Sequence, residues 1–152
     1  MDLQATRPTP EGWPRLSPSL AYQDPVRAIE WLQAAFGFGV RITVPDGAGG
    51  IRHSELTFGE AVVMVAGEQP QGVLRARSPK SLEGVNTQAL FVYVDDIEAH
   101  YARALAAGAV VKRELATTDY GPEYWRDRGY TVLDPEGHAW HFAQRLPAAS
   151  KG

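Results

Sequence analysis

Two stretches of the sequence follow one plan: DPVRAIEWLQAAFG (24–37) and DIEAHYARALAAG (96–108). Each begins with an aspartate, a preferred N-cap residue, and continues with apolar residues at helical spacing. For the second stretch, either Asp95 or Asp96 is the expected cap. Each ends on a glycine, which readily adopts the left-handed conformation that terminates helices. In the first stretch a proline takes the first helical position, where its missing N–H is not needed. The two stretches are therefore predicted to be helices that end at their glycines.

The two helical stretches belong to a longer repeat. Asp24 and Asp96 are 72 positions apart, and Gly37 and Gly108 are 71 positions apart. One strand-like run precedes each predicted helix and three follow it, separated by turn residues. These runs are Leu16–Gln23, Val40–Val44, Ile51–Phe58 and Ala61–Ala66, then Ala89–Val94, Val110–Leu115, Gly129–Leu133 and His138–Ala143. The sequence thus predicts two strand–helix–strand–strand–strand (βαβββ) modules.

A four-stranded sheet with one helix leaves a face uncovered, so two modules, within one chain or across a dimer, are expected to combine. We predict an α+β fold in which two βαβββ modules form a curved, mixed, eight-stranded sheet with the helices outside and a cup inside. The modules cover residues 16–66 and 87–146. An extended arm (1–15), a linker (67–86) and a tail (147–152) complete the predicted organisation.

The composition excludes several classes of site. The 152 residues include no cysteine, which rules out disulfides, thiolate metal sites and cysteine nucleophiles. The net charge of -3 argues against a nucleic-acid-binding protein. No apolar run approaches the roughly 20 residues of a membrane span, and the first residues lack the apolar core of a signal peptide. We therefore expect a cytoplasmic protein with a small organic partner, and neither a nucleic acid nor a membrane.

Several phrases of the sequence resemble the vicinal oxygen chelate superfamily, which includes glyoxalase I, bleomycin-resistance proteins and extradiol dioxygenases. They are PEGWPRLSPSLAYQDPVRAIEWLQAAFGF (10–38), HSELTFGEAVVMV (53–65), TQALFVYVDDIEAHYARALAAGA (87–109) and TVLDPEGHAWHF (131–142). The resemblance is closest to the glyoxalase-like, bleomycin-resistance-like branch. It implies a glyoxalase-like fold and, because such members usually dimerise, a homodimer.

The resemblance also locates the metal positions of the superfamily, whose metal enzymes present His or Glu from four strands into the cup. In this sequence these positions hold Ser17, Met64, Ala89 and His141. A divalent metal held by protein needs three or four N, O or S donors, and this set offers one good ligand. We therefore expect no metal and no other cofactor.

The alternation of side chains along a strand predicts which residues line the cup. The apolar residues of a strand should face the helices. In the strand 51–58 these are Leu56 and Phe58, so His53 and Glu55 on the opposite face should line the cup. Phe91, Tyr93 and His141 follow in the same way from the second module. The predicted cup residues are Ser17, Ser19, His53, Glu55, Met64, Phe91, Tyr93 and His141. We expect His53, Glu55 and His141 to share one cavity walled by the two aromatic residues.

The stretch 117–125 contains three aromatic residues in a polar setting with a Gly-Pro pair. It is predicted to be a loop near the mouth of the cup that serves as a lid, a dimer contact or a cover for the sheet edge. Its residues Tyr120 and Trp125 join the predicted ligand contacts.

Three functions are compatible with the sequence. The first is a metal-free protein that binds a small organic molecule, which needs no catalytic residue. The second is a metal-free enzyme in which His53, Glu55 or His141 transfers a proton, since histidine titrates near neutrality and burial can raise the pKa of a glutamate. The third is a metal-dependent lyase, isomerase or dioxygenase, which the ligand positions disfavour. The identity of catalytic residues, if any, and of the ligand is left open.

Overall fold

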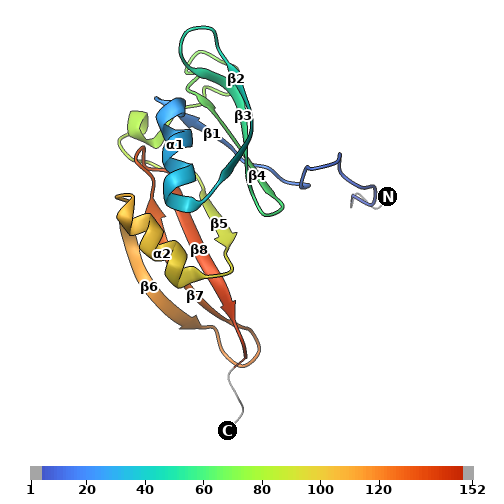
Figure 1. Cartoon of the computed structure of the whole chain (residues 1–152), viewed down its shortest axis with the longest axis vertical. Coiled ribbons are helices and arrows are strands. Elements are labelled where there is room, and N and C mark those ends of the chain that lie inside the picture. The colour runs from blue at the N-terminus through green and yellow to red at the C-terminus, as the bar shows by residue number, and fades with distance from the viewer. Residues whose placement is uncertain (1–4, 149–152) are drawn as a thin grey trace.

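The computed structural model describes residues 5–148, so residues 1–4 of the predicted arm and 149–152 of the predicted tail lie outside the described residues. Two βαβββ modules follow one another along the long axis (Figure 1). The elements are β1 (Ser19–Tyr22), α1 (Pro25–Phe36), β2 (Gly39–Pro45), β3 (Ile51–Phe58), β4 (Ala61–Gly67), a 3-10 helix η1 (Pro79–Leu82), β5 (Ala89–Tyr93), α2 (Ile97–Ala106), β6 (Val110–Asp119), β7 (Arg126–Leu133) and β8 (Ala139–Leu146). This order confirms the prediction of two modules; η1 was not predicted.

The strands form two mixed four-stranded sheets, β1-β4-β3-β2 and β5-β8-β7-β6, and not the single eight-stranded sheet of the prediction. In each sheet the first strand of the module lies at an edge and pairs in parallel with the last strand. No strand of the described chain pairs with the other edge of β1 or β5. The sheets stay separate because the modules join through their helix-covered faces, where α1 lies beside α2 (Figure 1).

Both helices begin at the predicted type of cap. The Asp24 carboxylate accepts a hydrogen bond from the Arg27 backbone N–H at 3.1 Å, and Asp96 accepts one from Ala99 at 3.0 Å. Asp96, and not Asp95, is therefore the second cap. No helix among residues 5–148 is long and apolar enough to cross a membrane.

One hydrophobic core serves both modules. Phe36, at the end of α1, is fully buried, and its ring centroid lies 4.6 Å from that of Phe142 and 5.4 Å from that of Trp140, both on β8. His100 of α2 closes this contact, because its Nε2–H donates to the Phe36 carbonyl at 3.0 Å. Packing of α1 against β8 therefore fixes how one module sits on the other.

The turn before β8 is a buried polar junction. The Asp134 carboxylate is 3% exposed and accepts hydrogen bonds from the Tyr22 hydroxyl at 2.6 Å and from Trp140 Nε1 at 3.1 Å. It also accepts the backbone N–H groups of Glu136 and His138. Burial, followed by the charge of Asp134, raises the pKa of Tyr22 well above its ordinary value, so this tyrosine stays a hydrogen-bond donor. The junction thus ties β1 to β8.

Glu136 extends the same junction to the linker. Its carboxylate accepts the backbone N–H groups of Gln23 and Asp24 at the start of α1. It also accepts the hydroxyl of Ser78 at 2.7 Å, the residue that caps η1. The DPEG phrase of the second module therefore holds both modules and the linker together, which a turn prediction alone does not reveal.

Candidate functional site

Each sheet has one face against the helices and one open face, and burial confirms the predicted parity. On β3, Ser54 and Leu56 are fully buried toward the helices. Glu55, between them, points to the open face and pairs across to Met64 on β4. Met64 in turn pairs with Ser19 on β1, so the predicted cup residues of the first module lie side by side.

Glu55 is the centre of an ionic cluster on this first open face. Its carboxylate accepts hydrogen bonds from Arg41 Nε at 2.7 Å and from His53 Nε2 at 3.0 Å. The hydrogen bond from His53, and then that from Arg41, lower the pKa of Glu55 below its ordinary value. The suggestion that burial raises this pKa is therefore wrong, and Glu55 is a carboxylate rather than an acid. Arg41 also lies 4.8 Å from the Trp13 ring centroid, which docks the N-terminal arm here.

The open face of the second sheet is aromatic. Phe91 is 55% exposed and Tyr93 is 46% exposed, with ring centroids 5.1 Å apart. His141, which pairs with Phe91 across β5 and β8, has its ring centroid 4.9 Å from that of Phe91. Its Nδ1 is 2.8 Å from the hydroxyl of Thr131 on β7, which leaves Nε2 turned away from that contact.

An arginine continues this open face toward the end of the sheet. Arg145 Nε donates to Asp127 Oδ1 at 2.6 Å, and a second nitrogen of the same guanidinium contacts the Tyr93 hydroxyl. The guanidinium carbon lies 5.2 Å from the Tyr93 ring centroid and 4.7 Å from the Trp125 ring centroid. Asp127 is 6% exposed and also accepts the Tyr93 hydroxyl, so its charge is compensated. Extending the parity of β8 by four residues beyond His141 would have placed Arg145 here.

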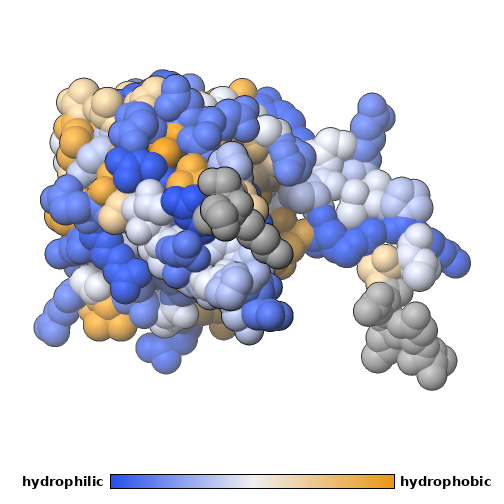
Figure 2. Space-filling model, turned by 90° about the horizontal axis from the view of Figure 1, so that it is seen from below, coloured by the Kyte–Doolittle hydropathy of each residue, from blue (hydrophilic) through white to orange (hydrophobic). Residues whose placement is uncertain are grey.

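The predicted loop 117–125 is shorter than expected, because β6 continues through Asp119 and only residues 120–125 form the tip of the β6–β7 hairpin. Tyr120 and Trp125 close this tip through a backbone hydrogen bond of 3.0 Å. Trp125 is 47% exposed, and its contact with Arg145 brings the tip to the second open face. Seen from this end, the surface is mostly hydrophilic with separate hydrophobic spots, and the N-terminal arm projects from the body (Figure 2).

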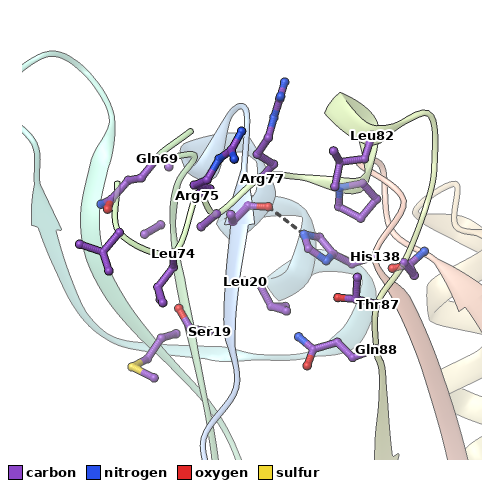
Figure 3. Close-up of a pocket in the computed structure, with 18 of the residues that line it drawn as sticks. Ser19, Leu20, Gln69, Leu74, Arg75, Arg77, Leu82, Thr87, Gln88 and His138 are labelled. Carbon is purple, nitrogen blue, oxygen red and sulfur yellow. Dashed lines mark hydrogen bonds between the residues drawn. The ribbon is translucent and has the colours of Figure 1, made fainter. Parts of the chain in front are cut away.

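Two cavities border the edge strands β1 and β5. One, of about 820 Å³, runs along β1 and the linker and is lined by Ser19, His53 and Met64. Figure 3 shows Ser19 and Leu20 on one side of it and His138 on the other, with the His138 hydrogen bond to the Ala21 carbonyl dashed. The second, of about 700 Å³, runs along the edge of β5. It is lined by Phe91 and Tyr93 and also by Phe36 of α1 and by His100 and Arg103 of α2.

Neither cavity is lined by both His53 and His141. The structure brings His53 together with Glu55, and His141 together with Phe91, on two different sheets. The single cavity that strand parity predicts is therefore not found within one chain. Parity fixes the face of each sheet on which a side chain lies, but it carries no information on how two sheets are placed.

The four positions that the resemblance matches to metal ligands hold a mixed set of side chains. Ser17 precedes β1, and its hydroxyl is buried without a hydrogen-bond partner among residues 5–148. Met64 and His141 lie on different open faces, and Ala89 has no donor atom. Over the described part of the chain, no group of three or more His, Asp or Glu side chains is placed to hold a metal.

His100 is a buried histidine that packs among several aromatic rings. Its Nδ1 accepts from the Tyr130 hydroxyl at 2.7 Å while Nε2–H donates to the Phe36 carbonyl. Both nitrogens are thus used in packing the helices against the sheet and against each other.

We expect the stability of the fold to fall on mild acidification. Burial lowers the pKa of His100, and burial followed by the charge of Arg113 lowers the pKa of His141. An unfolded histidine titrates near about 6.5, so the unfolded state binds more protons below that pH. The stabilisation is complete above about pH 6.5 and is lost as the pH falls through the lowered values. Unfolding by denaturant at pH values from about 7 to 5 measures this, and ring resonances of His100 or His141 that titrate at or above 6.5 would contradict it.

Comparison with known proteins gives a consistent result. Residues 16–142 match the model of the Glyoxalase/Bleomycin resistance protein/Dioxygenase superfamily. An uncharacterised protein of Mycobacterium bovis is 33% identical over 132 residues, which cover 86% of this chain and 83% of that protein. An uncharacterised protein of Mycobacterium tuberculosis is also 33% identical, with 74% of its length covered.

Solved structures show the same fold. The crystal structure of TioX from Micromonospora sp. ML1 is similar with a TM-score of 0.68 and 36% identity, over 86% of this chain and 98% of that one. A glyoxalase/bleomycin resistance protein/dioxygenase from Alicyclobacillus acidocaldarius has a TM-score of 0.62 at 13% identity, over 91% and 96% of the two chains. The chain belongs to the glyoxalase/bleomycin resistance protein/dioxygenase superfamily.

Proposed function

We propose that this protein binds a small organic molecule without a metal ion. The binding cup would have two walls, the open face of the first sheet and the open face of the second. The observation that carries the proposal is the half-exposed aromatic row of the second open face, Phe91 and Tyr93, beside the neutralised pair of Arg145 and Asp127. Ligand sites typically combine apolar and aromatic walls with a few placed polar groups. The first open face supplies polar groups through His53 and Glu55.

The side chains at the superfamily's metal positions support binding without metal. Serine, methionine, alanine and a single histidine do not form the set of three or four hard or borderline donors that a divalent cation requires. The Glu55 carboxylate, which lies opposite Met64 on the first open face, is already hydrogen-bonded to Arg41 and His53. The residues present therefore do not fit the metal site of the superfamily's enzymes.

A second copy of the chain would bring the two walls together. Within one chain β1 and β5 are sheet edges, and each borders a cavity. Uncovered edges and exposed aromatic faces favour association. Placing β1 of one copy beside β5 of the other gives the predicted eight-stranded curved sheet and puts His53 opposite His141 of the partner subunit. The proposed cup is thus formed across a homodimer.

A thermal-shift screen of small organic compounds tests the binding function. We expect a stabilising compound whose affinity falls by roughly 1–3 kcal/mol in Phe91→Ala, through lost apolar burial. Leu105→Ala on the outer side of α2 removes a comparably exposed side chain and should leave the affinity unchanged. If every compound that binds the wild type binds Phe91→Ala equally well, the aromatic face is not the site.

Proton transfer is the second candidate, and one contact favours it. His53 Nε2 is held at 3.0 Å by the Glu55 carboxylate, which leaves Nδ1 available to take a proton from a bound molecule. In that case His53→Gln would keep the affinity for the ligand and abolish its conversion.

A further inference from the structure

The second open face carries a continuous row of aromatic rings and one guanidinium, each in contact with the next. The row starts at His141, passes through Phe91 and Tyr93, and ends at Arg145 and Trp125. Neighbouring ring centroids are 4.9 Å and 5.1 Å apart, and the guanidinium of Arg145 lies 5.2 Å and 4.7 Å from the two rings beside it. All five side chains come from β5, β8 and the adjoining hairpin tip, so the row lies along one face of one sheet.

The residues beneath this row are small. Ala143 pairs with Tyr93 on one side and with Gly129 on the other, and lies between His141 and Arg145 along β8. A side chain at Gly129 would meet the Phe142 carbonyl at 2.6 Å and His141 Nε2 at 3.1 Å. Ala143 is fully buried beneath the row, where the rings of Phe91 and Tyr93 meet edge to face at an interplanar angle of 69°.

Arg145, at one end of this row, has N–H groups that form no hydrogen bond within the described residues. A guanidinium has five N–H donors; here Nε serves Asp127 and one terminal nitrogen serves the Tyr93 hydroxyl. The remaining donors have no partner among residues 5–148, and the arginine side chain is 47% exposed. The rings of Tyr93 and Trp125 lie beside the guanidinium. Two unused N–H groups on one edge of a guanidinium can bind a carboxylate through two parallel hydrogen bonds.

The charges around the row favour an anion at this end. Asp127 is buried and already bound by Arg145 and Tyr93, so it does not repel an incoming acid. Arg113 stands near His141 and, after burial, lowers the pKa of that ring, so the opposite end of the row is a neutral histidine beside a positive charge. No free carboxylate belongs to the row itself.

We infer that the ligand is an aromatic acid, whose ring packs against Phe91 and Tyr93 and whose carboxylate pairs with the unused N–H groups of the Arg145 guanidinium. This rests on the proposed function, because it names the chemical class of molecule that the same cup takes. The ring of the ligand would be stabilised by contact with Phe91 and Tyr93. Its carboxylate and the Arg145 guanidinium would form a charged pair beside Trp125 and Tyr93.

The test compares three probes by titration calorimetry on the full chain: 2-naphthoate, its uncharged amide, and decanoate. The wild type should bind 2-naphthoate about tenfold or more tightly than the amide, as expected for loss of a charge-assisted hydrogen bond, and decanoate weakly. Arg145→Lys keeps the charge beside Asp127 but removes the planar fork, so it should erase most of the preference for the acid. Arg128→Gln, which lies on the helix-facing side of β7 and pairs with Glu98, is the matched control and should retain it.

Trp125→Leu gives an independent check in which both Arg145 and Asp127 are retained. It should weaken binding of the acid more than that of the amide, because Trp125 lies beside the guanidinium that pairs with the carboxylate. Circular dichroism checks the fold. Equal binding of acid and amide by the wild type, or an undiminished preference in Arg145→Lys, overturns the inference. The inference is also overturned if neither aromatic probe binds while the compound screen finds another ligand whose binding depends on Phe91. In that case the proposed function still stands. If no organic compound binds at all, both fail.

Discussion

Replacing Asp134 with alanine is expected to lower the free energy of unfolding by at least about 3 kcal/mol, because a buried carboxylate with four donors is removed at once. The Tyr22 hydroxyl and Trp140 Nε1 lose their acceptor, and both lie in the fully buried core. The turn before β8 also loses the two backbone hydrogen bonds that shape it. Denaturant unfolding followed by tryptophan fluorescence measures the loss.

Asp95→Ala is the matched control for this change. Asp95 is exposed and lies next to the helix cap without serving as it, so its removal should change stability by less than about 0.5 kcal/mol. A loss at Asp134 no greater than that at Asp95 would show that the junction does not hold the modules together.

Phe36→Ala is expected to cost about 3–5 kcal/mol, the usual range for a fully buried aromatic side chain. Its ring touches Trp31 in its own helix as well as Trp140 and Phe142 of the other module. The cavity would therefore open in the core that both modules share, and unfolding should remain a single transition that shifts as a whole. Differential scanning calorimetry measures both the shift and the number of transitions.

Phe91→Ala is the comparison, because it removes a phenylalanine side chain from the second open face instead of from the core. Because Phe91 is 55% exposed, its loss should cost less than about 1 kcal/mol. Two separate transitions in Phe36→Ala would contradict a shared core. A stability loss in Phe91→Ala equal to that in Phe36→Ala would contradict the assignment of the two faces.

The local pattern of the sequence predicted the elements and the faces of their side chains. Period-two alternation placed Phe91 and His141 on one face and Trp140 on the other, because burial of one face fixes the register of a strand. The caps at Asp24 and Asp96 were readable for the same local reason.

The placement of the two sheets could not be read in this way. It depends on contacts between residues more than a hundred positions apart, such as Tyr22 with Asp134. The lowered pKa of Glu55 was missed because its largest cause, the hydrogen bond from His53 two residues away on the same strand, was not considered. The second contact, from Arg41, comes from a neighbouring strand at a bulge in the pairing. Arg145 was missed because the predicted strand ended at Ala143, whereas β8 continues to Leu146.

The most direct test of the proposed cup uses the absence of native cysteine. In the double variant Met64→Cys with Phe91→Cys, one thiol stands on each open face. Treatment with a short bismaleimide should produce a covalent dimer at twice the 16.6 kDa mass of the chain. The pair Met64→Cys with Leu105→Cys, whose second thiol is on the outer side of α2, should give little dimer. A cross-link between the two thiols of a single chain would contradict a cup formed by two copies. So would the absence of any cross-link together with a monomer in sedimentation.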